Sequence, residues 1–217
     1  HRLLNTMRNT IIAILIIIAL SFSLSIYFSP QMPELMASHW NAAGEVDGYM
    51  PKNWGLFFMP ILSVIMLALL VIVPRIDPLK KNIETFNKYF YGFLIAIFIF
   101  LFYLHVLTLM WNLGYRFELI RYLTPGFALL FFYCGILIEH AKKNFSIGIR
   151  TPWTLSSDKV WDKTHKIRGK LFKLAGILSL LGIFFPQQAI LFILIPILAI
   201  TFYLYIYSYL EHKKLKA

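Results

Sequence analysis

Six long apolar runs constrain this chain more than any other feature of its sequence. They cover residues 10–28, 55–73, 89–113, 122–138, 171–185 and 189–210. A transmembrane helix needs about 20 mainly apolar residues to cross the hydrocarbon core of a bilayer. Hydrophobic residues make up 59% of the chain and charged residues 14%, which is unusual for a soluble globular domain. The sequence therefore predicts an all-α membrane protein with six transmembrane helices.

The first and fifth runs need separate interpretation. Arg2 and Arg8 precede the first run as they would in a signal peptide, but the run is longer than a signal peptide needs and no clear cleavage site follows. We therefore expect a retained membrane anchor. The fifth run is short and contains Lys173, whose side chain can extend to the interface together with that of Lys170. We expect this run to cross the membrane in a helix that begins in the preceding loop.

Basic residues are distributed unevenly between the two sides of the six expected spans. All but three of the 21 Lys and Arg residues fall on one side, and the exceptions are Lys52, Arg116 and Arg121. Cytoplasmic loops carry such an excess, so we expect both termini in the cytoplasm (N-in, C-in). A net charge of +11 could indicate nucleic-acid binding in a soluble protein. Here the charge asymmetry favours an anionic bilayer, and we expect a multi-pass cell membrane protein without direct nucleic-acid contact.

The loop between the first two runs contains the passage HWNAAGEVDGYMPK. We single out an outer-loop motif that consists of His39, Trp40, Asn41, Gly44, Asp47, Gly48 and Tyr49. Its glycines and acidic residues are typical of turns, so we expect a short hairpin or an irregular cap on the outer side. His39, Glu45 and Asp47 could ligate a metal ion, but their spacing is not that of a metal site. We therefore predict no metal and expect the aromatic residues to lie at the headgroup level.

The loop between the fourth and fifth runs contains NFSIGIRTPWTLSSDKVWDKTH, which is unusually polar for this chain. Gly148 permits backbone conformations that other residues avoid, and Thr151 precedes a proline and so favours an extended conformation. Ser156 or Ser157 followed by Asp158 indicates the N-terminus of a helix. We therefore expect a cytoplasmic loop followed by a helix at this position.

Three residues of that helix share one face, because Trp161, His165 and Arg168 recur at helical spacing. Basic residues cover much of the remaining surface, so one interpretation is an interfacial helix that lies on anionic lipid. The other is a recognition surface that includes Arg150, whose guanidinium can bind a carboxylate or phosphate with two hydrogen bonds. The residues alone leave both interpretations open.

The third apolar run contains the polar residues His105, Thr108 and Asn112 on one face. Polar groups inside a bilayer often have a function, such as a transport path, but they also form hydrogen bonds between helices. The second role is favoured because no intramembrane acid accompanies them. No motif of a known catalytic site is present, and Cys134 has no second cysteine with which to form an intrachain disulfide or a metal cluster. We therefore predict no enzymatic activity and no cofactor.

The outer and inner passages together resemble the SdpI family, in which a small domain of unknown function precedes the SdpI region. The resemblance implies a bacterial or archaeal membrane protein that confers immunity to a secreted, membrane-active toxin peptide. It also implies a signal receptor that holds a cytoplasmic repressor at the membrane. The implied partner-binding residues are Asn144, Gly148, Arg150, Thr151, Pro152, Trp153, Thr154, Trp161 and His165.

The resemblance divides the chain into an N-terminal region of two spans with the outer-loop motif, residues 1–88, and an SdpI-like region of four spans, residues 89–217. The expected partners are the lipid bilayer, a toxin peptide on the outer side and a repressor protein on the cytoplasmic side. Fold resemblance alone does not transfer a ligand. A small transporter or channel-like protein, and an accessory subunit of a larger membrane complex, therefore stay as alternatives.

Overall fold

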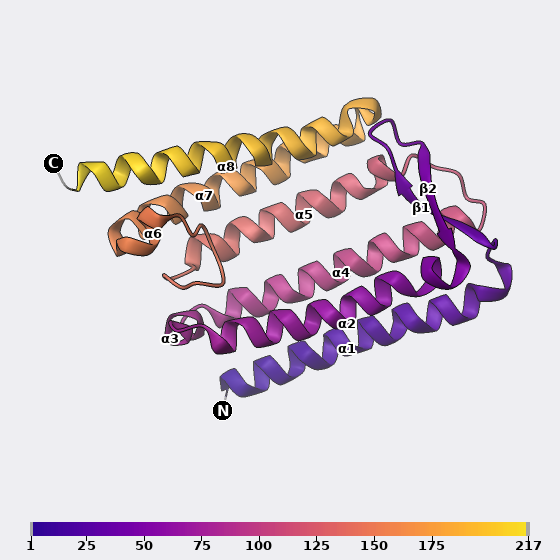
Figure 1. Ribbon diagram of the computed structural model, residues 1–217, viewed down its shortest axis with the longest axis horizontal. Coiled ribbons are helices and arrows are strands. Elements are labelled where there is room, and N and C mark those ends of the chain that lie inside the picture. Colours follow the sequence, from indigo (N-terminus) through magenta and orange to yellow (C-terminus); the bar gives the residue numbers. More distant parts are fainter. Residues whose placement is uncertain (1, 216–217) are drawn as a thin grey trace.

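Six long helices lie side by side and form the body of the protein (Figure 1). The computed structural model describes residues 2–215. The long helices are α1 (Arg2–Phe28), α2 (Lys52–Ile76), α4 (Asn87–Asn112), α5 (Leu119–His140), α7 (Asp158–Ser179) and α8 (Ala189–Lys214). The short helices α3 (Lys80–Glu84) and α6 (Pro152–Ser156) lie at one end, together with both ends of the chain. This end is expected to face the cytoplasm, since most basic loop residues lie there.

A β-hairpin closes the opposite end of the bundle (Figure 1). Its strands β1 (Leu35–Trp40) and β2 (Val46–Pro51) are antiparallel, and a bulge interrupts the register near Ser38. The Asn41 side chain accepts hydrogen bonds from the backbone N–H groups of Ala43 and Glu45, which shapes the turn. Gly44 completes the turn with a φ of 81°, a conformation that favours glycine. The expected cap is therefore a hairpin, although the protein is otherwise helical.

Five helical segments are long and apolar enough to span a membrane. They are Asn5–Gln31, Lys52–Ile76, Asn87–Asn112, Leu119–His140 and Pro186–Lys214. These segments correspond to five of the six expected spans. The fifth expected span falls in α7, in the 3₁₀ turn η2 (Leu180–Ile183) and at the start of the connection to α8 through η3 (Pro186–Gln188). The first half of α7 is rich in charged residues, which is why α7 lacks the composition of a membrane span.

Helix α7 nevertheless packs tightly along α5 inside the bundle. Two glycines allow this close approach. A Cβ atom on Gly135 of α5 would lie 2.6 Å from the Gly169 carbonyl oxygen, and a Cβ atom on Gly169 would lie 2.7 Å from the Glu139 Cβ. Small residues let helix backbones approach one another in this way inside membranes. Gly135 on α5 and Gly169 on α7 therefore allow the close contact between the two helices.

The charges of α7 are partly neutralised by its neighbours. Lys173 forms an ion pair with Glu139 of α5, and the Lys163 Nζ lies 2.5 Å from a carboxylate oxygen of Glu211 on α8. Only 6% of the Glu211 side chain is exposed. A buried carboxylate without a partner would be costly, so this pair fixes α8 against the start of α7. Lys173 thus has an acidic partner, in addition to the route to the interface that the sequence indicated.

The first prediction concerns the orientation of the two ends. Ala43 in the hairpin turn and Ser156 at the end of α6 are both exposed. In right-side-out vesicles, an impermeant thiol reagent should label Ala43→Cys, whereas Ser156→Cys should be labelled only after permeabilisation. The protein with only the native Cys134, which is partly buried in α5, is the control. Labelling of both positions from the same side would refute the N-in, C-in orientation.

Candidate functional site

The inner loop, which we define as residues 141–157 between α5 and α7, is held together from within by Asn144. This side chain is fully buried. Its Nδ2 donates to the carbonyl oxygens of Lys142 and Ile147, at 2.7 and 3.0 Å. Its Oδ1 accepts from the backbone N–H groups of Ser146 and Ile147, at 2.8 and 2.6 Å. All its hydrogen-bonding groups are thus used inside the loop, so Asn144 fixes the backbone shape.

The connection between α2 and α3, together with α3 itself, fastens the inner loop from outside. Asp77 is 4% exposed, and its carboxylate accepts from the Phe145 backbone N–H at 2.9 Å and from the Ser146 hydroxyl at 2.5 Å. The Asn82 Nδ2 donates to the Lys143 carbonyl oxygen at 2.7 Å. Sequence reasoning missed both residues. An acid within a basic connection is a weak signal, and its partner lies 68 residues away in the chain.

Gly148 is the point where the loop meets α7. Its φ of 123° favours glycine, and an added Cβ atom would lie 2.4 Å from the His165 Nε2 and within 3.2 Å of the Trp161 ring. Trp161 is completely buried, and its Nε1 donates to the Ala141 carbonyl oxygen at 2.8 Å. The Trp161 and His165 rings are stacked with their centroids 3.9 Å apart. The loop therefore closes over a pair of buried rings.

His165 is bound through both ring nitrogens. Nε2 accepts from the Ile149 backbone N–H at 3.0 Å, so Nδ1 carries the proton and donates to the Trp161 carbonyl oxygen at 2.9 Å. A doubly protonated imidazole could not accept the first of these bonds. Burial lowers the pKa of His165 to about 4. The side chain is therefore neutral near pH 7 and acts as a fixed link between loop and helix.

The second half of the loop is fixed to α8. Thr151 and Thr154 form a capping box at the start of α6, and the Thr151 hydroxyl also donates to the Ser208 hydroxyl at 3.0 Å. The Trp153 ring packs against Tyr205 and Tyr209 of α8, with centroids 5.1 Å apart in both pairs. Thr151 has the extended conformation that the sequence predicted, and Pro152 is the first residue of α6. As the sequence indicated, Ser157 caps α7 by accepting from the Val160 N–H.

Arg150 of the inner loop and Arg168 of α7 have no acidic partner in the part of the chain that the structure describes. Arg150 is exposed and donates to the Phe145 carbonyl oxygen at 2.6 Å. The guanidinium of Arg168 lies over the Phe172 ring at 4.6 Å. Burial lowers the pKa of Arg168, and the like charge of Arg150 lowers it further. Within residues 2–215 neither guanidinium takes part in an ion pair. Such a pair of cations favours an anionic group as a partner.

The structure thus separates the predicted partner-binding residues into two groups. The buried group consists of Asn144, Thr151, Thr154, Trp161 and His165. The other group consists of the exposed residues Arg150 and Pro152 and the partly buried residues Gly148 and Trp153. The buried group gives the loop its shape from beneath. Direct contact with a partner stays a prediction. The exposed residues are the ones that a partner can reach.

At the outer end, the hairpin is bound to α4 through Asn112. The Asn112 Oδ1 accepts from the Ala37 N–H at 2.7 Å, and its Nδ2 donates to the Ala37 carbonyl oxygen at 3.0 Å. The side-chain amide thus pairs with one residue of β1 as another strand would. The Trp40 ring packs edge-on against Trp111. On the opposite side of the hairpin, the His39 Nδ1 lies 2.5 Å from Asp47, so these two residues pair with each other across the strands.

A second prediction follows from the pairing of Asn112 with Ala37. Asn112→Leu should leave both backbone groups of Ala37 without partners, at a cost of about 2 kcal/mol. We expect a lower melting temperature and faster hydrogen exchange of the Ala37 amide in purified protein. Thr108→Val is the matched control, because its hydroxyl donates only to Leu104 of the same helix. Unchanged exchange at Ala37 in Asn112→Leu would contradict this role.

The remaining polar residue of α4, His105, joins three helices. Its Nε2 lies 3.0 Å from the Ser25 hydroxyl of α1, which donates to the Leu56 carbonyl oxygen of α2 at 2.6 Å. Both His105 and Ser25 are buried. The hydrogen bond between helices that was expected for His105 is therefore present, whereas Asn112 bonds to strand β1 instead of another helix. Each of them connects α4 to another element of the N-terminal half.

A mainly apolar pocket of about 340 Å³ lies beneath the hairpin. Residues from β1, β2, α2, α4, α5 and α8 line it, so it touches both halves of the chain. They include Trp40, Phe58, Leu104, Leu123, Phe127 and Ile193. Thr108 lines the same pocket, while Asn112 holds the strand that covers it. The pocket therefore joins the outer-loop motif to the polar face of α4.

The fold defines a multi-pass cell membrane protein with a fixed hairpin at one end and a fixed loop at the other. Residues 140–208 match the SdpI/YfhL protein family, and residues 16–64 match a domain of unknown function, DUF1648. The chain is 27% identical to "Immunity protein SdpI" of Bacillus subtilis (strain 168) over 210 residues, which is 96% of this chain and 98% of that protein. No solved structure matches the chain.

The resemblance to the SdpI family is therefore confirmed, with the DUF1648 region before the SdpI region. The outer-loop motif lies within the first matched region and the inner passage within the second. The SdpI family is not a family of enzymes. The division of the chain at residue 88 stays a prediction, since α4 packs against α1 as well as α5.

Proposed function

We propose that this protein is a membrane immunity protein that protects its cell against a membrane-active toxin peptide, without catalysis. The observation that carries the proposal is the match to an immunity protein over nearly the full length of both chains. The match includes both the hairpin end and the inner-loop end. A shared membrane anchor alone would not require similarity at both ends.

We further propose six spans, with the second half of α7, η2 and the residues before α8 forming the fifth. Three features support this count. The region from Leu174 to Phe185 is apolar, and η3 then turns the chain directly into α8. The Lys173 charge is paired with Glu139, which reduces the cost of its position near the membrane. An even number of spans also agrees with the two chain ends lying at the same end of the bundle (Figure 1).

The outer pocket beneath the hairpin is our candidate for the contact with the toxin peptide. Its lining is mainly apolar, and the hairpin also carries two exposed apolar side chains, Leu35 and Tyr49. A peptide that disrupts membranes is itself partly apolar, so burial of one of its side chains in this pocket would be favourable. The pocket supports this proposal through its chemistry and its location on the outer side.

On the cytoplasmic side we propose that the inner loop binds an acidic group of a partner protein, as a signal receptor would. Arg150 and Arg168 support this role, because both lack an acidic partner within residues 2–215. Arg150 is held in place by its bond to Phe145. An arginine that is already oriented loses less entropy when it binds a carboxylate. The repressor that the family resemblance implies is our candidate partner.

The proposal is tested in Bacillus subtilis cells that lack their own SdpI and are exposed to their toxin peptide. Expression of this protein should restore survival, and survival no better than that of cells with an empty vector would refute immunity. For the receptor role, Arg150→Lys should lose at least tenfold in capture of the repressor at the membrane, because lysine cannot form two parallel hydrogen bonds. Survival and thermal stability should be unchanged.

The matched control is Lys159→Gln, which removes an exposed charge at the start of α7, outside the proposed contact. If lipid attraction were the main role of the loop, Lys159→Gln would reduce repressor capture more than Arg150→Lys. Only Lys159→Gln changes the net charge of the protein. Normal capture by Arg150→Lys would contradict the receptor role and leave the immunity proposal intact.

A further inference from the structure

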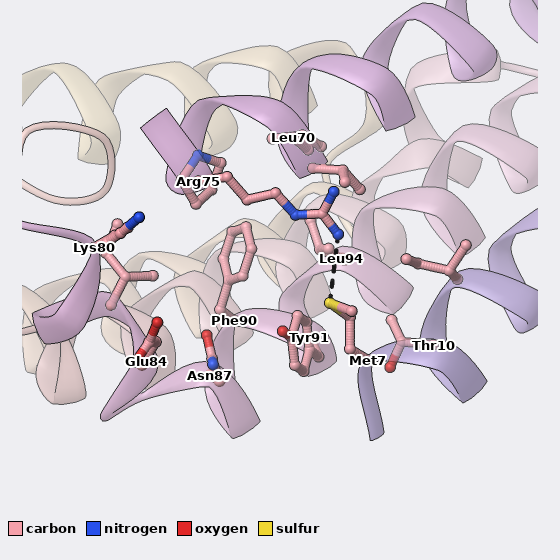
Figure 2. A pocket seen from close by; sticks show the side chains of 14 residues that line it. Met7, Thr10, Leu70, Arg75, Lys80, Glu84, Asn87, Phe90, Tyr91 and Leu94 are labelled. Carbon is pink, nitrogen blue, oxygen red and sulfur yellow. Dashed lines mark hydrogen bonds between the residues drawn. The ribbon is translucent and has the colours of Figure 1, made fainter. Parts of the chain in front are cut away.

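A second pocket, of about 490 Å³, lies at the cytoplasmic end of the bundle between α1, α2 and α4 (Figure 2). It is separate from both the hairpin and the inner loop. Its inner walls are apolar and include Ile11, Leu70, Phe90 and Leu94. Arg75, Lys80 and Glu84 also line the pocket, and all three are exposed. The pocket therefore combines an apolar interior with a charged rim.

The rim carries charges of both signs, but they are not paired with one another in the described part of the chain. Within residues 2–215 none of Arg75, Lys80 and Glu84 takes part in an ion pair. The Arg75 Nη2 donates only to the Met7 sulfur, at 3.6 Å, and a thioether is a weak acceptor. Figure 2 shows the Arg75 side chain extended across the pocket from α2 toward Met7 on α1. A guanidinium in this position can exchange the sulfur for a stronger acceptor.

The position of the pocket determines which acceptors are available. The positive-inside distribution places this end at the cytoplasmic leaflet, which carries anionic lipids. Basic pockets between transmembrane helices on this side are suited to phospholipid headgroups. The planar guanidinium of arginine matches a phosphate group, and Lys80 adds a second positive charge. The apolar walls between α1, α2 and α4 match an acyl chain.

We propose that this pocket binds one anionic glycerophospholipid of the cytoplasmic leaflet. The phosphate contacts Arg75 and Lys80, and one acyl chain lies between α1, α2 and α4. Glu84 and Asn87, which line the pocket beside them, accept hydrogen bonds from hydroxyl groups of the headgroup. A glycerol headgroup meets both requirements, because it supplies hydroxyls to the acid while the phosphate neutralises the cations.

The test uses the full-length protein in detergent, with phosphatidylglycerol as the probe. Native mass spectrometry and thermal melting should show one retained lipid and a higher melting temperature. Arg75→Gln and Lys80→Gln should each weaken binding about tenfold or more, since each removes a charge-assisted hydrogen bond. Val71→Trp should also weaken binding by filling the apolar part of the pocket.

The controls are Arg8→Gln and Lys81→Gln, which remove exposed charges from the same end of the protein outside the pocket. Both should bind phosphatidylglycerol as the unaltered protein does. If Arg75→Gln is unstable without lipid, Lys80→Gln, on the surface of the short helix α3, carries the test.

Two further probes distinguish the sources of phosphate and the type of headgroup. Inorganic phosphate should not raise the melting temperature, because it lacks an acyl chain. Phosphatidylethanolamine should bind more weakly than phosphatidylglycerol. The proposal would be overturned by equal binding of the two lipids or by an equal rise in melting temperature with inorganic phosphate. It would also be overturned if the pocket variants and the control variants lost lipid binding equally. None of these results depends on immunity or on repressor capture.

Discussion

Trp161→Ala should strongly destabilise this protein, by about 3–5 kcal/mol. The side chain is completely buried, so its removal leaves a cavity where the inner loop meets α7. The Ala141 carbonyl oxygen would lose its hydrogen bond and His165 its stacking partner. We expect a much lower melting temperature in detergent, and faster hydrogen exchange in residues 141–157.

Trp54→Ala is the control for this substitution, because that tryptophan is 60% exposed at the opposite end of the protein. It should change the melting temperature little. Equal shifts for Trp54→Ala and Trp161→Ala would show that Trp161 does not support the loop.

Repressor capture should distinguish the structural from the exposed residues of the loop. Trp161→Ala should lose both stability and capture, whereas Arg150→Lys should lose capture alone. The difference follows from their positions, since Trp161 lies beneath the loop and Arg150 lies on its surface.

The second large effect is a loss of stability in mild acid through His165. The pKa of this side chain is lowered from 6.5 to about 4 by burial. Between these values the unfolded chain binds a proton that the folded protein excludes, so the free energy of unfolding rises with pH in this window. The stabilisation is fully present above pH 6.5 and is lost as the pH falls toward 4. Its full size is on the order of 3 kcal/mol.

The measurement is the melting temperature of the purified protein between pH 7.5 and about 4. Other groups titrate in the same range, so the decisive quantity is the difference between the unaltered protein and His165→Gln. Glutamine can accept from Ile149 and donate to Trp161 but does not titrate. The variant should therefore lose less stability on acidification, and parallel curves for the two proteins would refute the assignment.

Much of the fold was predictable because membrane insertion depends on local composition. Five of the six expected spans are present as apolar helices, and Ser157 is the N-cap of α7 where the capping signal indicated. The exception, α7, has weak apolar character because its first half carries many charged residues. Its contacts depend on Gly135 and Glu139 of α5, and such pairings between distant segments leave little trace in one sequence.

The candidate partner-binding residues came from the resemblance to the SdpI family, but their geometry was not predictable. Helical spacing correctly placed Trp161 and His165 on one face. It could not show that this face packs beneath the inner loop, because that depends on Gly148 and on the end of α5. Asp77 was missed for the same reason, since its role exists only when the loop lies beside the connection between α2 and α3.

The sequence by itself determined the membrane environment, five of the spans, the side on which positive charge accumulates, and the turn residues of the hairpin. These features follow from the cost of burying polar groups in lipid and from local backbone preferences, which act over short stretches of chain. Only the tertiary structure decided which polar groups are paired. Three of these pairings join distant segments: Asn112 with Ala37, Asp77 with the inner loop, and Lys163 with Glu211. A buried hydrogen-bonding group needs a partner in space, and packing of the helices determines which partner it finds.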